Sequence, residues 1–160
     1  MPNKRELLDT IIARLAEEVE LMTQAALATH AEATDDENKA EDKYDTRGLE
    51  ASYLAHGQSK AAEEAALAVA QFRALAARDL QPGEPISLGA LVTVETRGKP
   101  AYYFVGPRAG GTEIKFDGRE VLVITPQSPL GRQLVGKTEG AVLHLDIGGR
   151  KSDAKIIRVV

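Results

Sequence analysis

The chain has 160 residues, 43% hydrophobic and 28% charged, with a formal net charge of −4, which is typical of a globular protein of one or two domains. It contains no cysteine, which excludes disulfides, thiolate metal sites and thiol nucleophiles. The charged N-terminus is unlike a signal peptide, and no run of about 18 apolar residues could span a membrane, so we expect a cytoplasmic protein.

The charge is divided unevenly along the chain. Residues 1–80 carry 9 Lys and Arg against 16 Asp and Glu, a net charge of −7, whereas residues 81–160 carry 11 against 8, a net charge of +3. This asymmetry predicts two modules with different partners. Because phosphate attraction dominates nucleic-acid binding, the acidic half suits protein or metal partners better than nucleic acid.

The first half has the pattern of two long helices. Residues 4–33 contain neither Gly nor Pro, and their apolar residues recur at heptad a and d spacing. A second seam with the same spacing follows, and Pro82 and Gly83 end it. The two seams are Leu8, Ile12, Leu15, Val19, Met22 and Ala26, then Leu54, Gln58, Ala61, Ala65, Ala68, Phe72 and Leu75. We expect an antiparallel coiled-coil hairpin over residues 1–80, with arms about 45 Å long.

An acidic segment lies between the two seams and would form the tip of the hairpin, near residues 34–50. Residues 32–50 hold eight acidic and three basic side chains. From the residues alone, this segment could also be a solvated turn, as charge runs usually are, and the coiled coil could serve only for dimerisation.

The second half, residues 85–160, changes to short β-branched or aromatic runs separated by turn residues. Asp117-Gly118 is typical of a two-residue hairpin turn. Ser128-Pro129 has the pattern of a helix start and Gly136 that of a helix end, which predicts one short helix. The expected strands are Leu91–Val94, Tyr102–Val105, Ile114–Phe116, Val121–Ile124, Val142–Leu145 and Ile156–Val159. The fold class is therefore α+β, with a stiff linker at residues 81–85 before an antiparallel sheet domain.

Several other chemistries have little support. His30, His56 and His144 lack metal-ligand spacing, and no G-x-S-x-G elbow is present. The glycine-rich stretch 106–111 has no following Lys-Ser or Lys-Thr and no helix after it, which indicates a hairpin loop rather than a phosphate-binding loop.

Residues 102–140 resemble the C-terminal domain of the bacterial GreA/GreB transcript-cleavage factors. The shared pattern is a strand ending in Val-Gly, Ser-Pro before a short helix, Leu-x-Gly-Lys at its end, and a later Gly. Here these are Val105-Gly106, Ser128-Pro129, Leu134-Val135-Gly136-Lys137 and Gly140. The resemblance implies an FKBP-like fold for residues 85–160, without implying peptidyl-prolyl isomerase activity. The family also has an antiparallel coiled coil with an acidic tip.

The resemblance implies a role in transcription elongation. In the family the globular domain rests on RNA polymerase at the secondary channel rim and the coiled coil enters the channel. Its tip carboxylates help to bind Mg²⁺ in the polymerase active site, which promotes cleavage of backtracked RNA. The implied partner is bacterial RNA polymerase, with the nascent RNA 3′ end met only indirectly. We expect a monomer without independent enzyme activity, no membrane partner, and no stable Mg²⁺ binding by the free protein.

The family's Asp-x-x-Glu tip pair corresponds here to Asp42 and Asp45, so an aspartate replaces the glutamate, and the Asn-Ala-Glu-Tyr continuation of the family is missing. The resemblance makes Asp42 and Asp45 the candidate catalytic and Mg²⁺-binding residues. Glu41 and Glu50 rank second, and residues 35–37 (Asp, Asp, Glu) rank third. For docking on polymerase we expect the turn and helix containing Ser128, Pro129, Leu130 and Arg132.

Two alternatives remain open. The protein could occupy the secondary channel without promoting cleavage, because surplus carboxylates can hold a metal in an unproductive geometry. It could also be a coiled-coil protein-binding module unrelated to polymerase. A stable dimer would be evidence for this alternative and against insertion into the channel. An isomerase has the least support, because three of the four aromatic residues in this half are consecutive and alternate faces.

Overall fold

The computed structural model describes residues 3–34, 47–147 and 149–160. The chain forms two compact units. The hairpin unit comprises residues 13–70, and the sheet unit comprises residues 1–12 together with residues 71–160. The predicted linker at residues 81–85 therefore lies inside the sheet unit.

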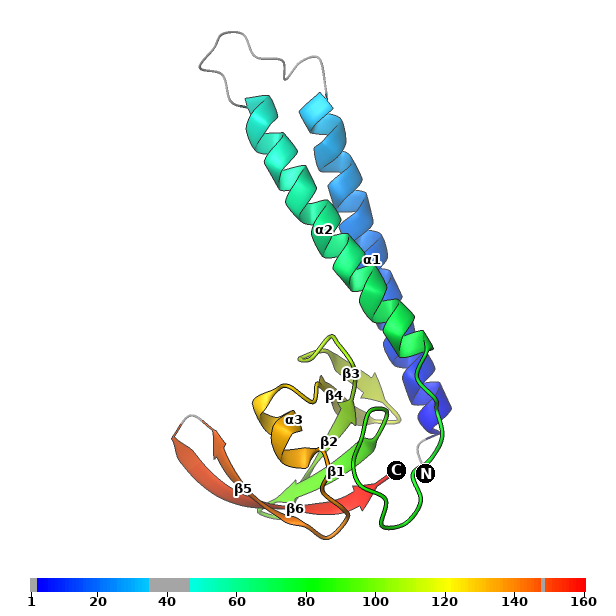
Figure 1. The fold of residues 1–160 in the computed structure, drawn as a ribbon, viewed down its shortest axis with the longest axis vertical. Helices are drawn as coiled ribbons and strands as arrows, with labels where there is room; N and C mark the ends of the chain where they lie inside the picture. The colour runs from blue at the N-terminus through cyan, green and yellow to red at the C-terminus, as the bar shows by residue number, and fades with distance from the viewer. Residues whose placement is uncertain (1–2, 35–46, 148) are drawn as a thin grey trace. The chain divides into compact units, whose positions relative to one another are not determined.

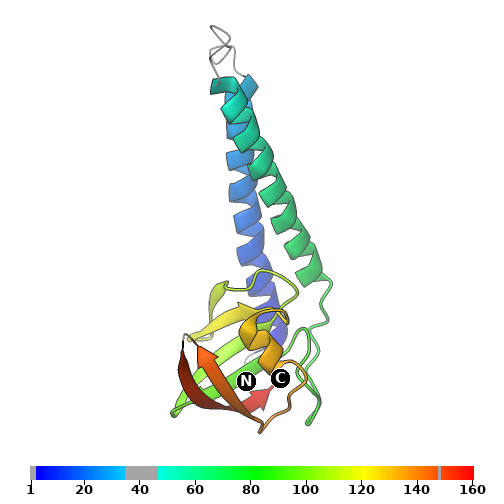
Figure 2. The ribbon, with the colours of Figure 1, turned by 60° about the vertical axis from the view of Figure 1, so that its left-hand side comes forward.

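The hairpin unit contains most of two long helices, α1 (Lys4–Thr34) and α2 (Arg47–Arg73). They run side by side in opposite directions (Figure 1 and Figure 2). The residues buried between them are mostly small, namely Leu15, Ala26, Ala55, Ala62, Ala68 and Val69. Small side chains let two helices approach closely but bury little apolar area each. No helix among the described residues is long and apolar enough to cross a membrane.

The predicted seam of the second helix is buried at Ala68 and Phe72, but nearer the start of the helix it is displaced by one residue. Leu54 is 58% exposed and Ala61 is exposed, whereas the following residues, Ala55 and Ala62, are buried. In the first helix, Met22 was predicted to be in the seam and is 39% exposed. An alanine-rich helix has apolar residues at two adjacent phases with the same 3–4 spacing, so its sequence does not determine which phase is buried in each turn.

The sheet unit contains a six-stranded sheet and a short helix, which confirms the predicted α+β class. Its elements are β1 (Leu91–Thr96), β2 (Lys99–Val105), β3 (Glu113–Phe116), β4 (Arg119–Ile124), α3 (Pro129–Leu134), β5 (Val142–Ile147) and β6 (Arg150–Val159). The strand order is β3-β4-β2-β1-β6-β5. Each predicted strand and the predicted helix lies within or overlaps one of these elements.

One strand pair differs from the expected antiparallel sheet. β2 and β4 pair in parallel, while every other neighbouring pair among the described strands is antiparallel. After β2 the chain skips one position in the sheet, and β3 forms the edge strand. β4 then fills the position between β3 and β2. At the start of this crossover, the Gly106 N–H donates to the Ile124 carbonyl (2.8 Å).

Two tight turns position the neighbouring strands. Both turn residues have positive φ at Arg97-Gly98 (52° and 75°) and at Asp117-Gly118 (51° and 71°). Two consecutive residues with positive φ define the type I′ turn, whose twist matches that of an antiparallel hairpin. The hairpin predicted at Asp117-Gly118 is therefore confirmed.

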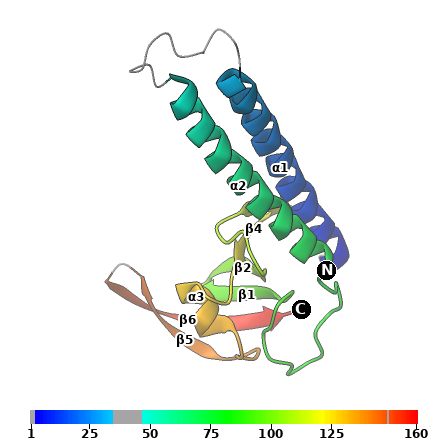
Figure 3. The ribbon, with the colours of Figure 1, turned by 45° about the horizontal axis from the view of Figure 1, so that its top comes forward.

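The two faces of the sheet bury different partners. α3 lies on one face of the sheet (Figure 3). Its Leu134 belongs to the main core, together with Ile86, Ala90, Val92, Val94, Val105, Ile124, Leu143, Leu145, Ala154 and Ile156. On the other face, Phe104 stacks on Phe72 from the end of α2, with ring centroids 6.3 Å apart. Tyr103 packs against the main core, whereas Tyr102 lines a pocket with Leu91 and Thr93, so the three aromatic residues alternate as expected.

Polar contacts connect the start of α1, the segment after α2 and the end of the chain beyond β6. The buried Lys4 amine donates to the carbonyl oxygens of Arg78 (2.7 Å) and Val160 (2.9 Å). Burial lowers the pKa of Lys4. Arg78 also forms a two-pronged ion pair with Glu84, which together with the Gln81 N–H lowers the Glu84 pKa to about 2.

Candidate functional site

The predicted docking residues Ser128, Pro129, Leu130 and Arg132 come together at the start of α3. Ser128 is the N-cap, because its extended backbone (φ −66°, ψ 157°) precedes the helix and its Oγ accepts the Gly131 N–H (3.0 Å). The same hydroxyl donates to the Thr125 carbonyl (2.7 Å). Pro129 occupies the first turn, where its missing N–H costs no helix hydrogen bond.

The end of α3 is fixed to the segment before β1. The Gly136 N–H donates to the Ile86 carbonyl (2.9 Å), and the Ile86 N–H donates to the Lys137 carbonyl (2.8 Å). Gly136 has φ 86°, a conformation that costs little only for glycine. The Leu-x-Gly-Lys residues therefore end the helix and hold it on the sheet.

The predicted docking residues differ in how much of each side chain is exposed. Pro129 and Arg132 are exposed, Ser128 is half-buried, and Leu130 is half-buried against the main core. The guanidinium of Arg132 has no hydrogen-bond or ion-pair partner among the described residues. α3 thus offers a cation beside apolar surface, an arrangement suited to protein contact.

The structure brings none of the predicted tip ligands together. Glu41, Asp42, Asp45 and residues 35–37 lie outside the described residues. Glu50 is described, and it is exposed in the first turn of α2. Within the described part of the chain, no group of three or more His, Cys, Asp or Glu residues could hold a metal ion.

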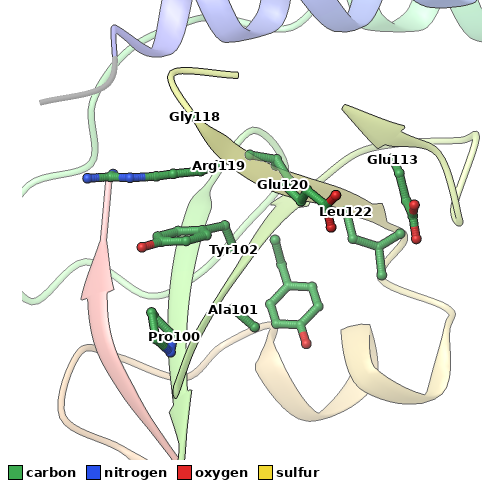
Figure 4. Close-up of a pocket in the computed structure, with 10 residues that line it drawn as sticks. Pro100, Ala101, Tyr102, Glu113, Gly118, Arg119, Glu120 and Leu122 are labelled. Atoms are coloured by element: carbon green, nitrogen blue, oxygen red, sulfur yellow. The ribbon is translucent and has the colours of Figure 1, made fainter. Parts of the chain in front are cut away.

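A second candidate region lies where β2 and β4 diverge, and the sequence analysis did not single it out. Their pairing begins only at Tyr102 and Val121, so the preceding residues of the two strands are not paired with each other. A cleft of about 520 Å³ opens there, lined by Tyr102, Tyr103, Arg119 and Glu120 among others (Figure 4). Two signals were present in the sequence: the consecutive aromatic residues, and the arginine after a predicted turn. Neither signal predicts which strands pair, and the cleft depends on that pairing.

The described residues thus define an α+β protein with a two-helix hairpin, a six-stranded mixed sheet, and a capped short helix on one face of that sheet. No protein-family model matches the chain, and no curated protein is significantly similar to it in sequence.

Similar solved structures exist at low sequence identity. The GreA factor homolog 1 (Gfh1) protein of Thermus thermophilus is 21% identical over 93% of this chain and 94% of its own, with a TM-score of 0.38. Thermus aquaticus Gfh1 is 20% identical over 92% of each chain, with a TM-score of 0.41. The prokaryotic transcription elongation factor GreA/GreB from Nitrosomonas europaea is 18% identical over 73% of this chain and 94% of its own, with a TM-score of 0.37. Identities and TM-scores this low do not establish a family.

Proposed function

We propose that this protein binds bacterial RNA polymerase at the secondary channel rim through the sheet unit and inserts its helical hairpin into the channel. The proposal is carried by the GreA/GreB-like motif in residues 102–140, which occurs together with an acidic segment between two long helices. The described geometry of α3 supports the docking part, because the Ser-Pro turn of that motif presents an exposed cation and an exposed proline.

The acidic segment supplies the proposed chemistry. Mg²⁺ prefers hard oxygen ligands, and a pair of metal ions can stabilise both the attacking and the leaving oxygen of a phosphodiester displacement. Asp42 and Asp45 would donate carboxylate oxygens in the polymerase active site, with Glu41 and Glu50 behind them. The protein itself would then have no separate activity, but would stimulate cleavage of backtracked RNA by the polymerase.

The aspartate at position 45 gives this proposal a specific variant. An aspartate carboxylate reaches about 1.5 Å less far from the backbone than that of a glutamate, roughly one C–C bond. Because a misplacement of 1 Å can cost on the order of 100-fold in rate, Asp45→Glu should change the cleavage rate strongly if this carboxylate acts on the metal. A side chain in a solvated turn would be insensitive to the same change.

The first experiment adds the purified protein and Mg²⁺ to a backtracked bacterial elongation complex with labelled RNA. Asp42→Ala and Asp45→Ala are compared with wild type, and Glu17→Ala, an exposed change on α1, is the matched control. Cleavage that both tip variants lose and the control keeps supports the cleavage factor. Protection of the RNA from an authentic cleavage factor, without cleavage, supports the non-cleaving channel regulator instead. If the protein causes neither cleavage nor protection, only the unrelated binding module remains.

The docking part has its own test, which does not depend on cleavage. Arg132→Glu should weaken binding to the polymerase without unfolding the sheet unit, because the Arg132 side chain is exposed. Arg150→Glu, an exposed change at the start of β6, is the matched control. Equal affinities for the two variants and wild type would rule out this surface.

A further inference from the structure

The sheet unit has an edge strand that the proposed function does not use. β5 stands at one end of the strand order, and β6 is its only strand partner among the described residues. In Figure 1, β5 forms the outer border of the sheet. The strand at the opposite edge, β3, has four residues, whereas β5 has six. An open edge of this length presents backbone hydrogen-bonding groups to which another strand can add.

The pairing of β5 with β6 determines which of its backbone groups face the open edge. The Ile156 N–H donates to the carbonyl of Ala141, which lies opposite it, so the Ala141 carbonyl points toward β6 (2.9 Å). Along an antiparallel pair, hydrogen-bonded and non-hydrogen-bonded positions alternate. The N–H and carbonyl groups of Val142, His144 and Asp146 therefore point away from β6, toward the open edge.

The side chains of these three residues lie on an exposed, charged face. Each lies opposite a residue of β6, and all six residues are exposed. The opposite pairs are Val142 and Lys155, His144 and Asp153, and Asp146 and Lys151. His144 Nδ1 lies 2.7 Å from Asp153 Oδ1. Because an ionised carboxylate only accepts hydrogen bonds, Nδ1 is the donor, and Nε2 of the ring is left for a further partner.

A second copy of β5 matches these charges in one register. If two β5 strands pair antiparallel about a twofold axis at Leu145, each His144 lies opposite Asp146 of the other copy. Across the four strands, each row of side chains then reads Asp153, His144, Asp146 and Lys151. With the histidine protonated, the charge changes sign at every step of the row. Opposite charges at directly opposite positions stabilise strand pairing.

The neighbouring symmetric registers lack this match. With the axis at His144, the two histidines would face each other and Asp146 would face Val142. With the axis at Leu143, His144 would face Val142. Charged side chains on an edge strand often prevent pairing with another chain. On β5 each of the two charges has an opposite charge available in the antiparallel copy, so together they select one register.

We propose that the protein forms a weak homodimer by antiparallel pairing of two β5 strands, in which His144 of each copy pairs with Asp146 of the other. The backbones of each such pair also exchange two hydrogen bonds. A contact between two short strands is smaller than the interface of a stable complex, so the dimer should form at high protein concentration. The inference concerns one edge of the sheet unit and does not rest on the proposed function.

The test is sedimentation equilibrium of the full chain up to about 1 mM, a range that reveals weak association. The pH is 6, because a histidine is charged only when protonated. Wild type should show a reversible monomer–dimer equilibrium. Asp146→Lys and His144→Glu each place like charges opposite each other, so each variant alone should dimerise about tenfold more weakly or less. Lys115→Glu, an exposed change on the other edge strand, is the control and should dimerise as wild type does.

An equimolar mixture of the two variants tests the register. In the mixed dimer, the new glutamate of one chain lies opposite the new lysine of the other, and the second pair is the unchanged His144 and Asp146. The mixture should therefore dimerise about as strongly as wild type. The proposal is overturned if wild type stays monomeric, if both variants dimerise as wild type does, or if the mixture stays monomeric while urea unfolding shows both variants to be folded.

A second measurement needs no substitution. The backbone amides of His144 and Asp146 should exchange with solvent more slowly in wild type as the protein concentration rises, because the partner strand accepts their hydrogen bonds. Exchange rates that do not depend on concentration, in samples that contain dimer, would place the contact elsewhere and overturn the proposal.

Discussion

Gly106 illustrates how the sequence motif is tied to the packing of the sheet unit. Its φ lies outside the left-handed region, so its backbone conformation does not require glycine. However, a Cβ added at this position would lie 2.6 Å from Phe72 Cζ and 3.1 Å from Val123 Cγ1. Phe72 is completely buried and stacks on Phe104, so its ring cannot move away into solvent. Gly106→Ala should therefore destabilise the sheet unit.

The magnitude follows from the size of this overlap. To reach the 3.4 Å limit of ordinary contact, the Phe72 ring edge must move by about 0.8 Å within a closed core. Overpacking of this kind typically costs about 1–3 kcal/mol. Replacing glycine by alanine also reduces the entropy of the unfolded chain, which returns about 0.4–1 kcal/mol. The expected net loss for Gly106→Ala is about 1–2 kcal/mol.

The assay is urea unfolding of wild type, Gly106→Ala, Phe72→Leu and the double variant. The local probe is hydrogen exchange of the Val123 amide, which donates to the Thr112 carbonyl within the sheet unit. Because leucine has no ring edge to meet the new Cβ, the double variant should lose less than the two single variants together, by about 1 kcal/mol. Additive losses, or a Gly106→Ala variant as stable as wild type, would refute the steric explanation.

Three further predictions concern α3 and the segment before β1. Gly131→Ala should lose more than about 3 kcal/mol in urea unfolding, because the added Cβ would lie 1.8 Å from the Thr125 carbonyl oxygen, a backbone atom. Ser128→Ala should lose only about 1 kcal/mol in the same assay, the usual value for an N-cap. Because the folded pKa of Glu84 is about 2 and its ordinary value is 4.5, its ion pair with Arg78 stabilises the fold fully above about pH 4.5, and this contribution is lost as the pH falls toward 2. Thermal melts over this range should therefore show a smaller loss of stability for Glu84→Gln than for wild type.

The strands of the sheet unit were predictable because local chemistry determines them. Asp117-Gly118 and Arg97-Gly98 both adopt positive φ, and each forces the chain to reverse within two residues. Ser128 likewise determines the start of α3 through a contact only three residues away. In such cases a few neighbouring residues determine the turn or the helix start, so it can be predicted without knowing any distant contact.

The remaining features depend on contacts between distant parts of the chain. The alanine-rich second helix has equivalent spacing at two adjacent phases, and only packing against α1 selects Ala55 and Ala62 over Leu54 and Ala61. The parallel pairing of β2 and β4 depends on where the crossover after Gly106 leads the chain. A one-dimensional pattern predicts strands, but it does not specify which strands become neighbours.

The same distinction explains which candidate sites the sequence could reveal. The candidate docking residues could be proposed from the sequence because they are neighbours along the chain, from Ser128 to Arg132. The cleft at Tyr102 and Arg119 was not found, because its lining comes from β2, β3 and β4, which only the sheet brings together. At that cleft, the stacking of Arg119 on Tyr102 depends on the register of β4 against β2.

The residues of the α3 motif do not all support docking equally. Ser128 caps the helix, Gly131 avoids the Thr125 carbonyl, and Gly136 ends the helix, so the fold alone accounts for these three. Arg132 differs, since its side chain is exposed and has no polar partner among the described residues. The sheet unit should therefore tolerate changes at Arg132, and reduced polymerase binding by Arg132→Glu with an unchanged urea midpoint would locate the contact there. Unchanged binding would mean that the motif reflects the fold of α3 rather than a partner.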